Sequence, residues 1–385
     1  MEENKKNLYE RYYKLFLVIP LVLLIFSFLY MVNFYSNNSD FIKKDVSLTG
    51  GTVVTLVGDI DSSKFKEDLS SKLEGLNIRE VYDLVTKERK AVILETASDS
   101  AQTKKILEEY LGYELNSENS SFEFTGSTLS ESFYNQLLIA VWVAFILMGL
   151  VVFLIFGENK LIKLYASIIS LLCVKIAYSG IVVIHLLTIF LVFILILMLF
   201  YFSIKQKKGY ILPLIVLALS VLMVAFPLIY SSFPYLFLAG ISVILGIIYF
   251  IFSIPSFAVI LSAFADILMT LVFVNMLGMK ISGAGIVAFL MLIGYSVDTD
   301  ILLTTRLLKR SEGTLNERLF GAFKTGITMT LTSLFAVGAA LIIVKSFSIV
   351  LSQIFTILLI GLCFDIFNTW ITNASIIKWY AERRK

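Results

Sequence analysis

The chain has 385 residues, of which 58% are hydrophobic, and its mean hydropathy of +0.87 is too high for a soluble protein. A net charge of only +3 gives no reason to expect a nucleic-acid partner. The two cysteines, Cys173 and Cys363, both lie in apolar segments, and His185 is the single histidine. They indicate neither a disulfide framework nor a Cys/His zinc site, so no metal or other cofactor is expected.

Apolar stretches of about 20 residues recur along the chain, and each is long enough to span a bilayer. The first follows a basic start with Lys5, Lys6 and Arg11, and its length and lack of a small-x-small cleavage site favour a retained anchor over a signal peptide. About ten spanning helices are expected, at 14–34, 134–156, 159–180, 182–204, 210–231, 234–254, 257–278, 282–307, 322–343 and 349–377.

The distribution of basic residues gives an independent test of this topology, because Lys and Arg accumulate in short cytoplasmic loops. With the N-terminus inside, the short outer loops hold only Lys280 and Lys345, and Lys175 lies near an outer helix end. Nearly all the other basic residues of the membrane region then fall on the cytoplasmic side. Both termini are therefore expected in the cytoplasm, and the polar segment 36–130 outside it.

The polar segment shows the alternation of a small α+β domain. Its pattern predicts a strand over 45–57, a helix over 62–74 after the N-cap candidate Asp61, strands over 77–85 and 90–96, a helix over 100–111 that stops at Gly112, and a strand that starts at Phe122. This βαββαβ order is the ferredoxin-like arrangement. Gly50 and Gly51 are followed by neither Lys-Ser/Thr nor a helix, so they predict a bend or a close backbone approach rather than a phosphate loop.

Acidic residues identify the candidate site. After residue 134 the glutamates fall in polar breaks or in the tail, whereas four aspartates lie near the centres of hydrophobic segments: Asp266, Asp298, Asp300 and Asp365. A carboxylate at the bilayer centre costs about 2.5–3.5 kcal/mol on insertion scales, so each is a functional candidate. The alternative is that each is a neutral, hydrogen-bonded packing residue between helices.

Two of these aspartates share one segment, GYSVDTDILLTTRLLKR at 294–310. On a helix, Asp298 and Asp300 are about 200° apart, so they must face different neighbours. One is expected to meet the helix that carries Asp266, and the other to face Asp365 or a partner subunit. Arg306 lies about 12 Å along the helix from Asp298 and about 80° around it, so a direct bond between them is not expected.

Several motifs together carry a resemblance to a known family: TGGT at 49–52, FTGSTLSESF at 124–133, PSFAVILSAFADI at 255–267, GYSVDTD at 294–300 with the later Arg306, KTGITMTLTS at 324–333 and DIFNTWITNA at 365–374. The chain resembles the archaeal branch of SecF, the family of the smaller partner of SecD, within the resistance-nodulation-division superfamily. The resemblance covers about 10–156 and 255–380.

This resemblance implies an accessory subunit that assists protein export with a SecD-like subunit. Its expected partners are that subunit, the Sec translocation channel, the translocating polypeptide and the lipid bilayer of the cell membrane. It also implies coupling to a proton or ion gradient, for which the candidates are Asp298, Asp300, Asp266, Asp365 and Arg306. Gly50, Gly51 and Gly294 are structural or conformational candidates within the matching motifs.

The chain departs from the family pattern in two places. Bacterial members place Asn at position 298, Asp at 299 and Thr at 300, where this chain has Asp298, Thr299 and Asp300, so the acids are redistributed. The segment 157–254 has no counterpart in the usual six-helix SecF, and either extends the membrane region toward lipid or docks a partner.

The expected organisation is a cytoplasmic N-terminus and first helix at 1–35, the outer domain at 36–130, a second helix at 131–156, a four-helix insertion at 157–254, and core helices at 255–385.

A drug or lipid exporter of the same superfamily would share the intramembrane acids but usually has about twelve helices and two outer domains. A non-transporting scaffold subunit would tolerate neutral replacements of the aspartates. An enzyme is not expected, because no Ser/His, Cys/His or metal-ligand constellation appears.

Overall fold

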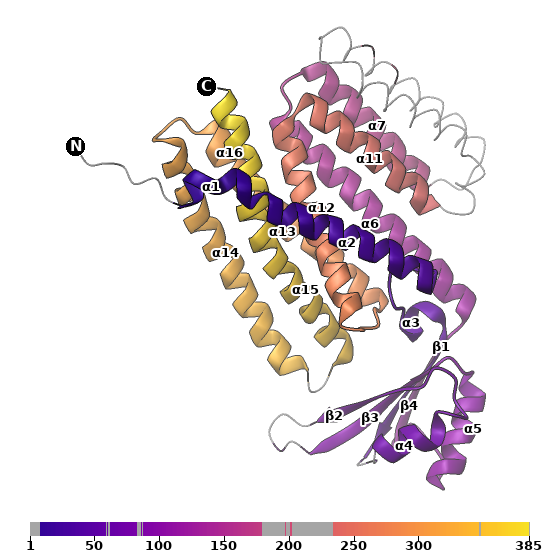
Figure 1. Cartoon of the computed structure of the whole chain (residues 1–385). Helices are drawn as coiled ribbons and strands as arrows, with labels where there is room; N and C mark the ends of the chain where they lie inside the picture. Colours follow the sequence, from indigo (N-terminus) through magenta and orange to yellow (C-terminus); the bar gives the residue numbers. More distant parts are fainter. Residues whose placement is uncertain are drawn as a thin grey trace.

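The computed structural model describes residues 8–178, 234–345 and 348–384, except 59, 61, 83–85 and 87, and also residues 197 and 201. It shows a bundle of long helices with a small sheet domain at one end (Figure 1). The expected helices 182–204 and 210–231 fall, apart from residues 197 and 201, outside the described part of the chain, as does the N-cap candidate Asp61.

Most of the long helices of the bundle are apolar along their length. The described helices of the bundle are α1 (Leu8–Phe16), α2 (Val18–Asn38), α6 (Ser127–Phe156), α7 (Lys160–Tyr178), α11 (Pro234–Phe252), α12 (Ile254–Met276), α13 (Gly283–Lys309), α14 (Leu315–Val344) and α15 (Ile349–Phe367), followed without a break by the π-helix η1 (Asn368–Asn373) and by α16 (Ala374–Arg383).

Within the described residues, six helical stretches are long and apolar enough to cross a membrane: Tyr12–Asn38, Ser127–Phe156, Ile254–Met276, Gly283–Lys309, Leu315–Val344 and Ile349–Arg383. They coincide with six of the spans expected from the sequence. Helices α7 and α11 lie where spans 159–180 and 234–254 were expected, and they pack beside α6 (Figure 1). Helix α13 lies at the centre of the bundle, against α12, α14, α15 and α6.

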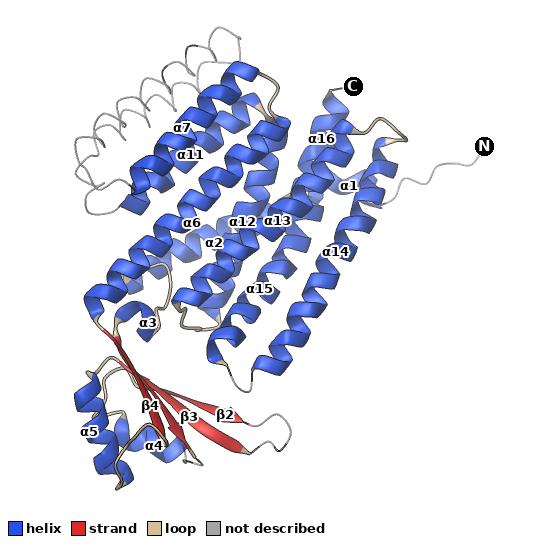
Figure 2. Cartoon of the chain, turned by 180° about the vertical axis from the view of Figure 1, so that it is seen from behind, coloured by secondary structure: helices blue, strands red, loops and turns tan. Residues whose placement is uncertain are grey.

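The sheet domain has the predicted βαββαβ order. Its elements are β1 (Gly51–Val57), α4 (Ser62–Leu69), β2 (Asn77–Tyr82), β3 (Arg89–Thr96), α5 (Ser100–Leu111) and β4 (Ser120–Thr125). The strands form one antiparallel sheet in the order β2-β3-β1-β4. Helices α4 and α5 lie on the same side of this sheet (Figure 2), where they enclose a core of Val54, Leu56, Phe65, Leu69, Leu73, Leu94, Leu107 and Leu115.

The expected strand over 45–57 is wrong in its first half. The Asp45 side chain accepts a hydrogen bond from the Ser47 backbone N–H at 2.8 Å and so caps a short helix, α3 (Val46–Thr49). Gly50 and Gly51 then have φ values of +86° and +136°, which ends the helix and turns the chain into β1. The β-branched residues of this stretch suggested a longer strand, but the local cap and the two glycines determine the backbone.

Both glycines also allow a close approach between chain segments. A Cβ atom at Gly50 would lie 2.6 Å from the Ser127 Cα, and one at Gly51 would lie 2.3 Å from the Thr96 carbonyl oxygen. The start of β1 therefore packs directly against the chain that enters α6. This contact fixes the sheet domain to the second membrane helix.

We expect Gly51→Ala to destabilise the sheet domain by about 1–3 kcal/mol, because Ala is strained at this φ and has no space for its methyl group. Urea unfolding of the full chain, followed by hydrogen exchange in β1 and β3, measures the loss. Gly126→Ala is the matched control, since a Cβ there meets nothing within 4 Å. Equal stability of the two variants would contradict the tight contact.

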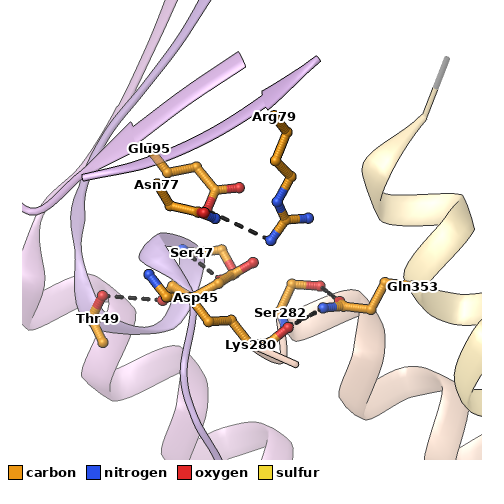
Figure 3. Close-up of polar contacts among 9 residues, drawn as sticks. All are labelled: Asp45, Ser47, Thr49, Asn77, Arg79, Glu95, Lys280, Ser282 and Gln353. Carbon is orange, nitrogen blue, oxygen red and sulfur yellow. Dashed lines mark hydrogen bonds and ion pairs between the residues drawn. The ribbon is translucent and has the colours of Figure 1, made fainter. Parts of the chain in front are cut away.

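A polar junction joins the sheet domain to the core helices (Figure 3). The backbone of Lys43 and Asp45 pairs with that of Ile281, just before α13. The Gln353 side chain, at the start of α15, accepts from the Ser282 N–H at 3.1 Å and donates to the Lys280 carbonyl oxygen. The segment that leads into the sheet domain is thus tied to the ends of α13 and α15 that are nearest to that domain.

Candidate functional site

Three of the four intramembrane aspartates are buried together inside the bundle. Asp266 on α12, Asp300 on α13 and Asp365 on α15 are 0%, 0% and 1% exposed. Within the part of the chain that the structure describes, none of the three forms an ion pair with Lys, Arg or His. Three negative charges in such a place would be strongly unfavourable.

The Asp266 carboxyl is fully hydrogen-bonded. The Ser296 hydroxyl on α13 donates to its Oδ2 at 2.6 Å, and the Asn368 amide on η1 donates to its Oδ1 at 2.7 Å. One carboxyl therefore joins three segments of the bundle. A change in its charge would alter the contacts of all three.

Asp300 and Asp365 are bonded to other residues of η1. The Asn373 amide donates to Asp300 Oδ1 at 2.8 Å, and the Thr369 hydroxyl donates to Asp365 Oδ1 at 3.2 Å. Thr369 also faces the Asp300 carboxyl, as does the hydroxyl of Ser262 from α12. The two carboxyls thus share Thr369 as a common neighbour.

The π-helix η1 supplies polar partners to all three carboxyls. Its residues Asn368, Thr369 and Asn373 are fully buried and bond to Asp266, Asp365 and Asp300 respectively. A π-helix has a wider turn than an α-helix, and such turns are frequent at functional sites. Sequence reasoning selected the aspartates but not these three residues. The signal that could have found them is the amide- and hydroxyl-rich run NTWITN in an otherwise apolar span.

Asp298 lies apart from the cluster. It is on the exposed face of α13, together with Met291, Gly294 and Tyr295, whereas Asp300 points into the bundle. The two aspartates therefore face different neighbours, and the buried one shares its surroundings with Asp365. A Cβ at Gly294 would meet nothing within 4 Å, so no close approach requires glycine there among the described residues.

Arg306 does not reach this cluster either. Its guanidinium donates to the Gly321 carbonyl oxygen at 2.6 Å and to the Thr325 hydroxyl at 2.9 Å. These bonds join the end of α13 to the start of α14. Arg306 therefore links two helices and does not contribute to the cluster.

The fold and this cluster define a multi-pass membrane protein whose helix bundle buries ionisable side chains. Residues 228–383 match the family described as "Protein export membrane protein SecD/SecF, C-terminal". The matching region contains the whole carboxyl cluster.

Curated relatives named "Protein-export membrane protein SecF" agree with this match. The chain is 52% identical over 114 residues to the one from Methanothermobacter thermautotrophicus and 49% identical over 116 residues to the one from Methanocaldococcus jannaschii. It is 43% identical over 118 residues to the one from Pyrococcus furiosus. These matches cover 29–31% of this chain and 39–41% of the relatives, so the chain spans about two fifths of the length of the curated relatives it matches.

A solved structure shares the fold. The crystal structure of SecDF, a translocon-associated membrane protein from Thermus thermophilus, aligns with a TM-score of 0.52 at 14% identity. The alignment covers 96% of this chain and 38% of that longer chain. At this identity the match shows a SecDF-like fold alone.

Proposed function

We propose that this protein is a SecF-like accessory subunit of the Sec translocase, which promotes protein export by using an ion gradient across the membrane. The observation that carries the proposal is the cluster of Asp266, Asp300 and Asp365 inside a SecD/SecF-family helix bundle. The names of the curated relatives support the export role. We propose no catalytic role for any residue.

A gradient supplies enough free energy for this task. Moving one elementary charge across 100 mV releases about 2.3 kcal/mol, which biases a two-state element when more than one charge moves. In our proposal, an ion enters the cluster and changes its charge, and the contacts between α12, α13 and η1 then rearrange. The polar junction at Gln353 and Ser282 passes this change to the sheet domain, because both residues lie at the outer ends of helices that carry the cluster.

The partner of the chain is a SecD-like subunit, and Asp298 marks where it docks. A carboxylate facing lipid at mid-span is costly, whereas one that faces a donor on a neighbouring helix is stabilised. The exposed face of α13 around Asp298 therefore fits a partner helix with a basic or hydrogen-bonding side chain. The Sec channel and the translocating polypeptide complete the proposed assembly.

We further propose that the sheet domain is ferredoxin-like and lies outside the cytoplasm, and that the whole chain forms about ten spanning helices. Its βαββαβ order and its β2-β3-β1-β4 sheet support the first point. The position of α1 and α16 at the end of the bundle opposite the sheet domain (Figure 1), together with the basic residues near that end, supports cytoplasmic termini. The proposed boundaries remain 1–35, 36–130, 131–156, 157–254 and 255–385.

This topology predicts opposite labelling of two single cysteines. In a background without Cys173 and Cys363, Ser117→Cys should react with an impermeant maleimide from outside the cell, and Ser311→Cys should react only from the cytoplasmic side. Both positions are exposed, so access depends on the side of the membrane alone. The proposed spans place an odd number of membrane crossings between the two positions. Reaction of both from one side would require an even number and would refute the topology.

The assignment itself is tested by isolating the complex in mild detergent and identifying the chains that co-purify. Recovery of a SecD-like chain is the expected result. A lone homotrimer would instead favour a small-molecule or lipid exporter of the same superfamily. A SecD-like partner without any gradient-dependent export would favour a scaffold subunit.

A further inference from the structure

The carboxyl cluster contains buried oxygen atoms that are not hydrogen-bonded. Among the described residues, Oδ2 of Asp300, Oδ2 of Asp365 and Oδ1 of Asn373 have no hydrogen-bond partner, and neither does the hydroxyl of Ser262. All four residues are at most 1% exposed. An unsatisfied buried polar group costs about 1–3 kcal/mol, so four in one region call for a physical reason.

These groups come from four segments, α12, α13, α15 and η1, and lie around Asp300 and Asp365. Thr369 on η1 donates to Asp365 and faces Asp300, and Asn373 is held against Asp300 by its own amide group. The Ser262 hydroxyl faces Asp300 from α12 and forms no hydrogen bond. The neighbours of the two carboxyls are therefore an amide oxygen and two hydroxyls, and every one of them offers an oxygen.

We propose that these oxygens bind one small monovalent cation, Na⁺, between Asp300 and Asp365. Small hard cations take oxygen ligands, and membrane transporters bind Na⁺ where irregular helical backbone interrupts a span, as η1 does here. Asp266 is not included in the site, because each of its oxygens already accepts a hydrogen bond, from Ser296 or from Asn368.

The number and charge of the available oxygen atoms indicate which ion the site binds. A proton can satisfy a single donor–acceptor pair, but Asp300, Asp365 and Asn373 each have an unpartnered acceptor oxygen. No group of three or more His, Cys, Asp or Glu side chains is positioned to hold a metal ion within the described residues. With one of the two carboxyls protonated, the other carboxylate and the neutral oxygens balance a single positive charge, which suits a monovalent cation. The role of the ion in export rests on the proposed function, whereas its binding does not.

The test is the thermal unfolding of the purified full chain in detergent, with Na⁺ exchanged for choline at constant pH and ionic strength. At about 100 times its Kd, Na⁺ should raise the Tm of the wild type by roughly 5 °C. Asp300→Asn and Asp365→Asn should abolish this rise. Thr369→Val should raise the half-saturating Na⁺ concentration by about tenfold, because it removes one neutral ligand and keeps the shape of the side chain.

Thr332→Val is the matched control, because Thr332 is on the exposed face of α14 and bonds only within its own helix, to the Thr328 carbonyl oxygen. Its Na⁺ response should equal that of the wild type. If the aspartate variants do not fold, the shift in Thr369→Val decides the question, and direct binding of radioactive ²²Na⁺ to wild type and Thr369→Val repeats it. A wild-type Tm that is independent of Na⁺, or a Na⁺ response that Thr369→Val leaves unchanged, would overturn the site.

The two proposals fail in different ways. A chain that binds no Na⁺ but still supports gradient-dependent export refutes the cation site and leaves the function, with protons as the coupling ion. A chain that binds Na⁺ but gives no gradient-dependent export refutes the function and leaves the site.

Discussion

Asp300→Asn is expected to abolish the part of protein export that depends on the ion gradient, while insertion and association with the SecD-like subunit stay intact. Asn has nearly the same shape as Asp and can keep a polar contact with Asn373, but it cannot change its charge. Each charge that crosses 100 mV can contribute up to about 50-fold in rate, since 2.3 kcal/mol is available. Translocation into inverted membrane vesicles, with and without an uncoupler, measures the loss.

The control for this variant is Glu312→Gln, which removes one negative charge at an exposed position between α13 and α14. Its export should equal that of the wild type. Asp266→Asn should show the same loss as Asp300→Asn, and the double variant should be no worse than either, if both acids act in one cycle. If all these variants retain uncoupler-sensitive export, the cluster serves only as a structural polar contact between helices.

Asp298→Leu is expected to give the second large effect, a loss of about 2–5 kcal/mol in the free energy of association with the SecD-like subunit. The substitution removes the one acid on the exposed face of α13 that a partner helix could bond. The isolated chain should insert at least as well as the wild type, because the cost of a carboxylate facing lipid disappears. Co-purification yields and titration of the partner in detergent measure the two effects separately.

Met291→Leu provides the comparison on the same face of α13, since Met291 is 43% exposed and carries no charge. Association should be unchanged in this variant. If Asp298→Leu also keeps full association, then the partner does not contact Asp298, and the exposed face of α13 has another neighbour.

The sequence was sufficient for elements whose ends are set by local chemistry. Helix α5 runs over the predicted 100–111 because Asp99 caps its first turn and Gly112 ends it in the left-handed conformation. The six candidate spans follow from hydropathy in the same way. The start of β1 was wrong because a single side-chain cap at Asp45 outweighed the β-branched pattern.

Only the aspartates of the candidate site could be predicted from the sequence, and their hydrogen-bond partners could not. Charge placement selected Asp266, Asp300 and Asp365, and the 100° step of a helix separated Asp298 from Asp300. Which aspartates meet depends on how α12, α13 and α15 pack, and hydropathy carries no information on packing between apolar helices. The partners Asn368, Thr369 and Asn373 depend in addition on the π-helical turn, a local change in hydrogen-bond register that periodicity does not predict.

The central claim is that ions reach the buried carboxyl cluster and that their passage drives export. The measurement that tests it most directly is ion flux into vesicles that contain the purified complex of this chain with its SecD-like partner, under an imposed membrane potential. We expect flux of Na⁺ or protons with the wild-type chain and loss of that flux with Asp300→Asn, at equal amounts of assembled complex. Equal flux through both complexes, or none through the wild type while gradient-dependent export persists, would contradict it.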